Sequence, residues 1–131
     1  MIALDASALA DWLLQTPRRG PKVAAELAAA GDVHTLDFAS LEVASVIRRK
    51  LRVGDLTQGR AAAALDDLLA APLNSYPAWP LARRAWELRA THTTYDGAYV
   101  ALAETLAVPL VTTDGKLARA HGHRAEIRLV T

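Results

Sequence analysis

The chain alternates between short apolar runs and longer segments in which apolar residues recur at helical spacing. Strands are predicted at residues 1–4, 33–36, 109–112 and 127–130, because each is a short, mostly apolar run next to polar or turn residues. Strands that alternate with helices indicate a parallel sheet that is covered on both faces. We therefore expect a three-layer α/β fold, in which helices flank a short parallel sheet of four to five strands on both faces.

The segments between these strands predict helices with recognisable ends. Ser7 is a suitable N-cap for a helix over residues 8–15, and Pro21 suits the first position of a helix that Gly31 closes. A helix that begins near Thr93 or Thr94 carries an acidic residue in its first turn.

A helical hairpin is predicted in the middle of the chain. Helices over residues 40–52 and 57–71 are separated by a short turn, so they should pack side by side. The next stretch, 72–80, contains three prolines, and it is expected to hold an edge strand or none.

Composition narrows the class of protein. With 131 residues, 52% of them hydrophobic and 22% charged, the chain should fold as a single globular domain over residues 1–131. No apolar run approaches the ~20 residues of a membrane span, and no basic-then-apolar leader opens the chain. The chain has no cysteine, which excludes disulfides and thiolate metal sites. We expect a cytoplasmic protein without a membrane partner.

Four acidic residues stand where predicted strands end or predicted helices begin. Asp5 follows the first strand, Asp114 follows a later one, and Glu42 and Asp96 fall in the first turns of helices. In an open parallel sheet, strand ends and the helix starts that follow them share one edge, where ligands bind. We therefore expect these four side chains to share one crevice.

Carboxylates gathered in this way repel one another, and their pKa values rise unless a cation is present. Oxygen ligands without nearby histidine or cysteine favour Mg2+, or Mn2+, over zinc. Such a site suits hydrolysis of a phosphodiester by a metal-activated water. Taken singly, each acid also has an ordinary explanation as a helix cap, a turn residue or a favourable first-turn charge.

Basic residues gather in three clusters, although the net charge of the whole chain is only +1. A basic rim around an acidic crevice would suit a polyanion such as nucleic acid. The same residues also have an ordinary use, because solvated helix faces and helix C-termini favour positive charge. The clusters are Arg18, Arg19 and Lys22; Arg48, Arg49, Lys50 and Arg52; and Arg83, Arg84 and Arg89.

The three tryptophans are candidates for stacking on bases. Trp12 and Trp86 recur at helical spacing with apolar neighbours, so we expect them in the core. Trp79 lies in the proline-rich stretch, and its place stays open.

The acids occur in four stretches of sequence: Leu4-Asp5-Ala6-Ser7-Ala8, Leu41-Glu42-Val43, Tyr95-Asp96-Gly97-Ala98-Tyr99-Val100-Ala101-Leu102-Ala103 and Leu110-Val111-Thr112-Thr113-Asp114. In this order and spacing they resemble the PIN-domain ribonucleases, and within them the VapC toxins of bacterial toxin–antitoxin modules. The resemblance covers essentially the whole chain. It implies a single PIN-like domain with Mg2+- or Mn2+-dependent endoribonuclease activity. It also implies a homodimer that a cognate antitoxin holds inactive.

Residue by residue, the resemblance implies that Asp5, Glu42, Asp96 and Asp114 form the catalytic acidic quartet. Asp5 and Asp96 would be the firmest metal ligands, and Asp114 a direct or water-mediated ligand. Glu42 would be a ligand or a base that orients water.

The resemblance also assigns supporting parts. Ser7 and Thr112 match hydroxyl positions that support the pocket, although a helix cap and a strand-end hydroxyl would explain them equally well. Gly97 stands where the family often has alanine, a change expected to loosen the helix start by up to ~1 kcal/mol. The hairpin over residues 42–71 corresponds to the region that commonly binds the antitoxin, a VapB-like protein.

Two other classes of function remain open at this stage. A signalling module could hold Mg2+ in an acidic pocket and accept phosphate, although Lys116 is the only candidate lysine after a late strand. The chain could also keep the fold as an inactive, partner-binding subunit, against which the intact acidic quartet argues.

Overall fold

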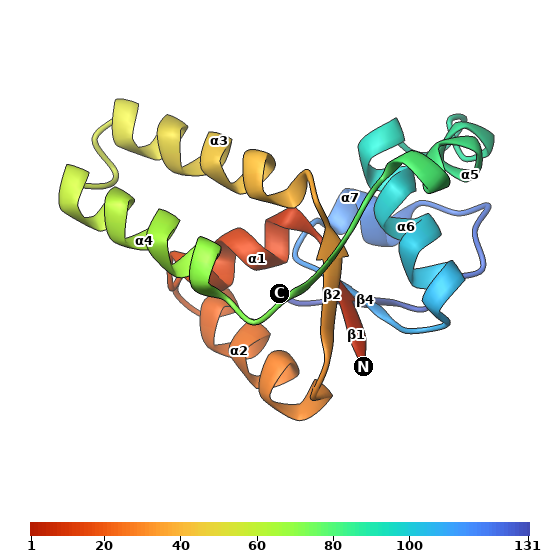
Figure 1. The fold of residues 1–131 in the computed structure, drawn as a ribbon, viewed down its shortest axis with the longest axis horizontal. Coiled ribbons are helices and arrows are strands. Elements are labelled where there is room, and N and C mark those ends of the chain that lie inside the picture. The colour runs from red at the N-terminus through yellow and green to blue at the C-terminus, as the bar shows by residue number, and fades with distance from the viewer.

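A five-stranded parallel sheet runs through the molecule, and the computed structural model describes all residues, 1–131, around it (Figure 1). The strand order is β3-β2-β1-β4-β5, and every neighbouring pair is parallel. The strands are β1 (Ile2–Leu4), β2 (Val33–Leu36), β3 (Asn74–Tyr76), β4 (Leu110–Thr112) and β5 (Ile127–Leu129).

Helices cover both faces of this sheet, which confirms the predicted three-layer α/β fold (Figure 1). On one side lie α1 (Ala6–Leu13), α2 (Arg19–Ala30), α3 (Ala39–Arg52) and α4 (Gln58–Ala70). On the other side lie α5 (Ala82–Glu87), which a short 3-10 turn (Trp79–Leu81) precedes, and α6 (Thr94–Leu106). A last helix, α7 (Gly115–Arg119), follows β4. None of the helices combines the length and the apolar character needed to cross a membrane.

Strand β1 occupies the centre of the sheet. Its Ala3 pairs with His34 of β2 on one side and with Leu110 of β4 on the other. All three residues of β1 are buried, because sheet and helices enclose it on every side. The residue that follows β1, Asp5, is therefore held at the centre of the carboxyl edge of the sheet.

Helix α6 runs through the hydrophobic core, a cluster of 29 buried residues to which most elements contribute. Its residues from Gly97 to Ala103 are all buried, so the helix start that carries Asp96 has little freedom to move. Thr93 caps this helix by accepting the backbone N–H of Asp96 at 3.1 Å.

Two predicted helix starts were placed wrongly. Asp5, not Ser7, is the N-cap of α1, because the carboxylate of Asp5 accepts the N–H of Ala8 at 3.0 Å. Ser7 lies inside the first turn instead. Helix α2 begins at Arg19, two residues before Pro21. The proline-rich stretch does hold an edge strand, β3, which pairs with β2.

Gly97 does not merely loosen its helix. A Cβ atom at this position would lie 3.2 Å from both the Cα and the carbonyl oxygen of Ala85, tighter than ordinary contacts. The glycine thus lets α5 pack against α6 at close range.

The prediction of a core position was wrong for Trp86, which is 60% exposed. Helix α5 has only six residues and buries Ala85, while the indole of Trp86 lies under the guanidinium of Arg89 at 4.3 Å. Trp12 packs partly buried against the core, and Trp79 is almost fully exposed.

Candidate active site

All four predicted acids line one cavity of about 380 Å³ at the carboxyl edge of the sheet. Asp5 caps α1 just beyond β1, and Asp114 caps α7 just beyond β4. Glu42 and Asp96 lie in the first turns of α3 and α6. We call this space the carboxylate cavity; its other lining residues are Ala6, Ser7, Ser45, Val46, Arg49 and Tyr99.

Asp5 is the most enclosed of the four acids, with 3% of its surface exposed. Its Oδ1 accepts hydrogen bonds from the Ser7 hydroxyl at 2.7 Å and from the Ala8 N–H at 3.0 Å, and its Oδ2 accepts one from the Thr112 hydroxyl at 2.6 Å. Burial raises the pKa of Asp5 to about 6, an effect that these hydrogen bonds oppose and the charge of Asp96 reinforces.

The hydroxyls of Ser7 and Thr112 tie the start of α1 to the end of β4. Thr112 Oγ1 donates to Asp5 and accepts the N–H of Asp114 at 3.0 Å. Ser7 Oγ donates to Asp5 and accepts the N–H of Thr113 at 3.1 Å. Both side chains therefore orient the carboxylate of Asp5 relative to the backbone that leads to Asp114.

Glu42 is held by a residue to which the sequence assigned no role. The buried phenol of Tyr99 donates a hydrogen bond to Glu42 Oε1 at 2.8 Å. Burial is the main cause that raises the pKa of Glu42; the hydrogen bond lowers it and the charge of Asp96 raises it. Burial and the nearby Glu42 also raise the pKa of Tyr99, so the phenol stays a donor. The sequence did contain a signal for this role, because Tyr99 lies three residues after Asp96 and therefore on the same face of the helix.

Asp96 and Asp114 interact electrostatically across the carboxylate cavity. Burial raises the pKa of Asp96, and the charge of Asp114 raises it further. Asp114 Oδ1 accepts the N–H groups of Lys116 and Leu117 at 2.9 and 3.4 Å, which fixes the carboxylate at the start of α7. The other oxygen of Asp114 makes no hydrogen bond to protein and is available to a ligand.

Arg49 is the one basic residue that lines the carboxylate cavity. It lies seven residues after Glu42 on α3, which is about two helical turns and places both side chains on one face. The sequence marked Arg49 only as part of a basic cluster, although the seven-residue spacing pointed to this placement.

The donor atoms of the cavity fit a hard divalent cation. They are carboxylate oxygens, and three of the four carboxyl groups have raised pKa values that a cation would lower again. As placed, however, no three His, Asp or Glu side chains are grouped closely enough to hold a metal ion together. The arrangement therefore suits an ion that takes one or two carboxylates directly and meets the others through water, as Mg2+ commonly does.

The sequence and structure are similar to those of known proteins. A family model described as PIN domain matches residues 2–122. Ribonuclease VapC12 of Mycobacterium tuberculosis is 44% identical over 130 residues, which cover 99% of both chains. Ribonuclease VapC3 of the same organism is 39% identical over 119 residues, 91% of this chain and 86% of the relative.

Two solved structures share the fold at lower identity. PAE2754 from Pyrobaculum aerophilum superposes with a TM-score of 0.70 at 21% identity and covers 96% of this chain and 81% of its own. VapC20 of Mycobacterium tuberculosis, described as a sarcin-ricin loop cleaving toxin, has a TM-score of 0.70 at 17% identity and covers 90% and 93%.

Proposed function

The chain belongs to the PIN-domain family as a VapC-type member, and we propose that it is a metal-dependent endoribonuclease that acts as the toxin of a toxin–antitoxin pair. The observation that carries this proposal is the meeting of Asp5, Glu42, Asp96 and Asp114 in one cavity. Their remote positions in the sequence argue against a purely structural reason for this meeting. The ribonuclease names of relatives that match nearly the whole chain support the reaction class.

In the proposed site, Asp5 and Asp96 would hold the cation, and Asp114 would take part directly or through water. When bound, Mg2+ or Mn2+ would neutralise the carboxylates and supply an acidified water for attack on phosphorus. Asp5 is suited to act as a metal ligand of fixed orientation, because three hydrogen bonds hold its carboxylate in one position. Asp114 is suited to act as a ligand through Oδ2, which accepts no hydrogen bond from the protein.

Glu42 would orient the attacking water and accept its proton. Tyr99 holds one oxygen of Glu42, and the other oxygen accepts no hydrogen bond from the protein. Arg49 lies where its guanidinium can bind the phosphate under attack.

A VapB-like antitoxin is the proposed protein partner, and the α3–α4 hairpin is its proposed binding site. The hairpin exposes Leu41, Val53 and Leu69, and a groove of about 590 Å³ lies between its helices. Helix α3 also carries Glu42, so a segment bound along the hairpin would reach the carboxylate cavity. We propose, from the family resemblance, that the chain forms a homodimer, which the molar mass in sedimentation would test.

Asparagine variants of the acids test the proposed nuclease function. Asp5→Asn and Asp96→Asn should abolish Mg2+- or Mn2+-dependent cleavage of RNA and growth arrest on expression, while the circular dichroism spectrum stays native. Asp66→Asn, on the exposed face of α4, is the matched control and should keep both activities. Undiminished, metal-independent cleavage by Asp5→Asn or Asp96→Asn would overturn the proposal.

A further inference from the structure

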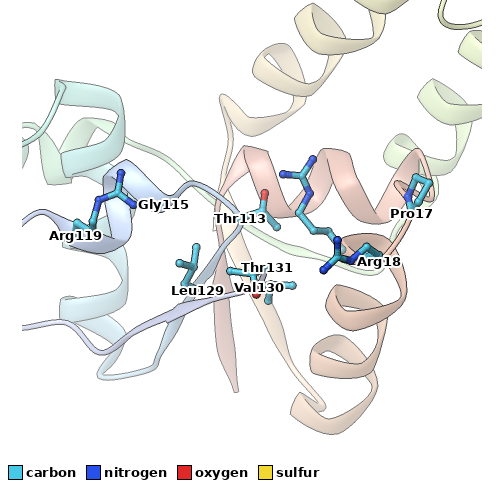
Figure 2. A pocket seen from close by; sticks show the side chains of 9 residues that line it. Pro17, Arg18, Thr113, Gly115, Arg119, Leu129, Val130 and Thr131 are labelled. Atoms are coloured by element: carbon cyan, nitrogen blue, oxygen red, sulfur yellow. The ribbon is translucent and has the colours of Figure 1, made fainter.

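A second cavity, of about 500 Å³, adjoins the carboxylate cavity along the segment that follows β4 (Figure 2). Thr113 and Gly115 line this second cavity, whereas Asp114 between them lines the first. Residues 113–115 thus form the wall between the two cavities. We call the second space the arginine cleft; it is lined by Pro17, Arg18, Arg19, Thr113, Gly115, Arg119, Leu129, Val130 and Thr131.

Two of the three arginines that line the arginine cleft have no side-chain partner within the protein. Arg18 and Arg119 stand on opposite sides of Thr113 (Figure 2), and neither makes a hydrogen bond through its side chain or an ion pair. Only Arg19 is paired, with Asp11 at 3.3 Å. No Asp or Glu side chain lines the cleft, and the main-chain oxygen of Thr131, which does line it, accepts a hydrogen bond from Lys22 at 2.6 Å. Unpaired guanidinium groups of this kind bind phosphate, often through two parallel hydrogen bonds.

Both arginines lie where the backbone is tightly turned or closely approached. Arg18 has φ 70° and ψ −55° at the centre of a γ-turn, in which the N–H of Arg19 donates to the carbonyl of Pro17 at 2.9 Å. Arg119 lies against Gly115, where an added Cβ would come within 2.8 Å of its Nη1. Both arginine side chains are exposed, so a ligand can reach them.

A polyanionic strand meets repulsion at four carboxylates, and it needs cations on either side of them to stay bound. Arg49 provides one such cation within the carboxylate cavity. We propose that the arginine cleft provides the others, by binding a backbone phosphate of the RNA that flanks the phosphate to be cleaved. This inference rests on the proposed nuclease function and names a substrate subsite for it. The cleft would bind any sequence, because it contacts phosphate and not bases.

Binding of RNA can be measured apart from its cleavage. All variants are made in an Asp96→Asn background, and the probe is a labelled single-stranded RNA oligonucleotide of mixed sequence, followed by fluorescence anisotropy. The test variant combines Arg18→Gly with Arg119→Gln; glycine accepts the positive φ at residue 18, so the fold is spared. The control combines Arg124→Gln with Arg128→Gln, which removes the same number of charges at two exposed residues outside the cleft and outside the three basic clusters.

The double variant should raise the Kd roughly tenfold near physiological salt. It should also reduce the slope of log K against log salt by about 0.7 for each phosphate that the protein no longer binds. The control should change neither quantity. With Asp96 restored, the double variant should raise KM for RNA and leave kcat nearly unchanged.

The outcomes separate this inference from the proposed function. Failure of the protein with Asp96 intact to cleave RNA would overturn the nuclease proposal and, with it, the subsite. Normal cleavage together with an unchanged Kd, salt slope and KM in the double variant would overturn the subsite alone. Loss of binding to an acidic protein segment, without loss of RNA binding, would assign the arginine cleft to a protein partner and also overturn the inference.

Discussion

The phenol of Tyr99 and the carboxylate of Glu42 join α6 to α3 across the carboxylate cavity, through a hydrogen bond of 2.8 Å. Tyr99 is 1% exposed, so its ring belongs to the core while its hydroxyl belongs to the site. One side chain thus links the packing of the central helix to the orientation of a carboxylate with a proposed catalytic role.

Replacement of Tyr99 by phenylalanine should leave the core packed and free Glu42 to move. We expect kcat for RNA cleavage to fall roughly tenfold, because Glu42 loses its fixed orientation. The free energy of unfolding should fall by about 1 kcal/mol. The hydrogen bond lowers the pKa of Glu42, so its loss should move the acidic limb of the pH–rate profile to higher pH. Tyr95→Phe, at an exposed phenol without a hydrogen bond, is the control. A profile that stays in place would contradict this role.

The stability of the metal-free protein should depend on pH through Asp5. Its pKa is about 6 in the folded state against an ordinary value of 3.8, so the folded state binds the proton more tightly than the unfolded chain does. Stability from this group is full below about pH 4 and falls by roughly 3 kcal/mol as the pH rises to about 6. The measurement is chemical denaturation of Asp5→Asn and of the unchanged protein, both in EDTA. The free energy of unfolding of the variant should rise relative to that of the unchanged protein as the pH increases through this range. A stability difference that is constant with pH would refute the assignment.

Divalent cations should stabilise the folded protein and so offset the destabilisation that ionised, buried carboxylates cause. Mg2+ or Mn2+ at about a hundred times its Kd should add about 2.7 kcal/mol to the free energy of unfolding and raise Tm by a few degrees. EDTA should restore the original melting curve. Asp96→Asn should lose most of the shift, whereas Asp66→Asn should keep it. Equal shifts in both variants would mean that the ion binds elsewhere on the protein.

Gly97→Ala tests how closely α5 packs against α6. Helix propensity alone predicts a gain of about 1 kcal/mol from alanine. The new Cβ would lie 3.2 Å from backbone atoms of Ala85, which move less readily than a side chain. We therefore expect no net gain in Tm, and a lower kcat because the start of α6 carries Asp96. Gly59→Ala, where a Cβ meets open space in another helix, should show the ordinary gain.

The acids of the site were predictable because each lies at a position with a strong local signal. Asp5 and Asp114 follow apolar runs that can only be buried strands, and Asp96 follows a helix-capping threonine. Parallel topology then places strand ends and helix starts on one edge, whatever the details of packing. The fold class followed from the same alternation of strands and helices.

What the sequence missed depends on contacts between distant elements. Asp5 and Ser7 are both good caps, and the choice of Asp5 cannot be separated from Thr112, which donates to it from 107 residues away. The role of Tyr99 depends on how α6 approaches α3. Helix propensity predicts the effect of Gly97 on its own helix but does not include the close approach of Ala85 from α5. Helical spacing predicted a buried Trp86 but does not show that α5 has only six residues.

The central place of β1 in the sheet has a consequence for protein synthesis. Thr112 and Asp114 are synthesised more than a hundred residues after Asp5. Until residues 110–112 emerge, β1 lacks the neighbour that pairs with it through Leu110. A nascent or truncated chain thus carries most of the acids without a cavity in which they meet. On the proposed function, nuclease activity would therefore begin only after the late strand has docked.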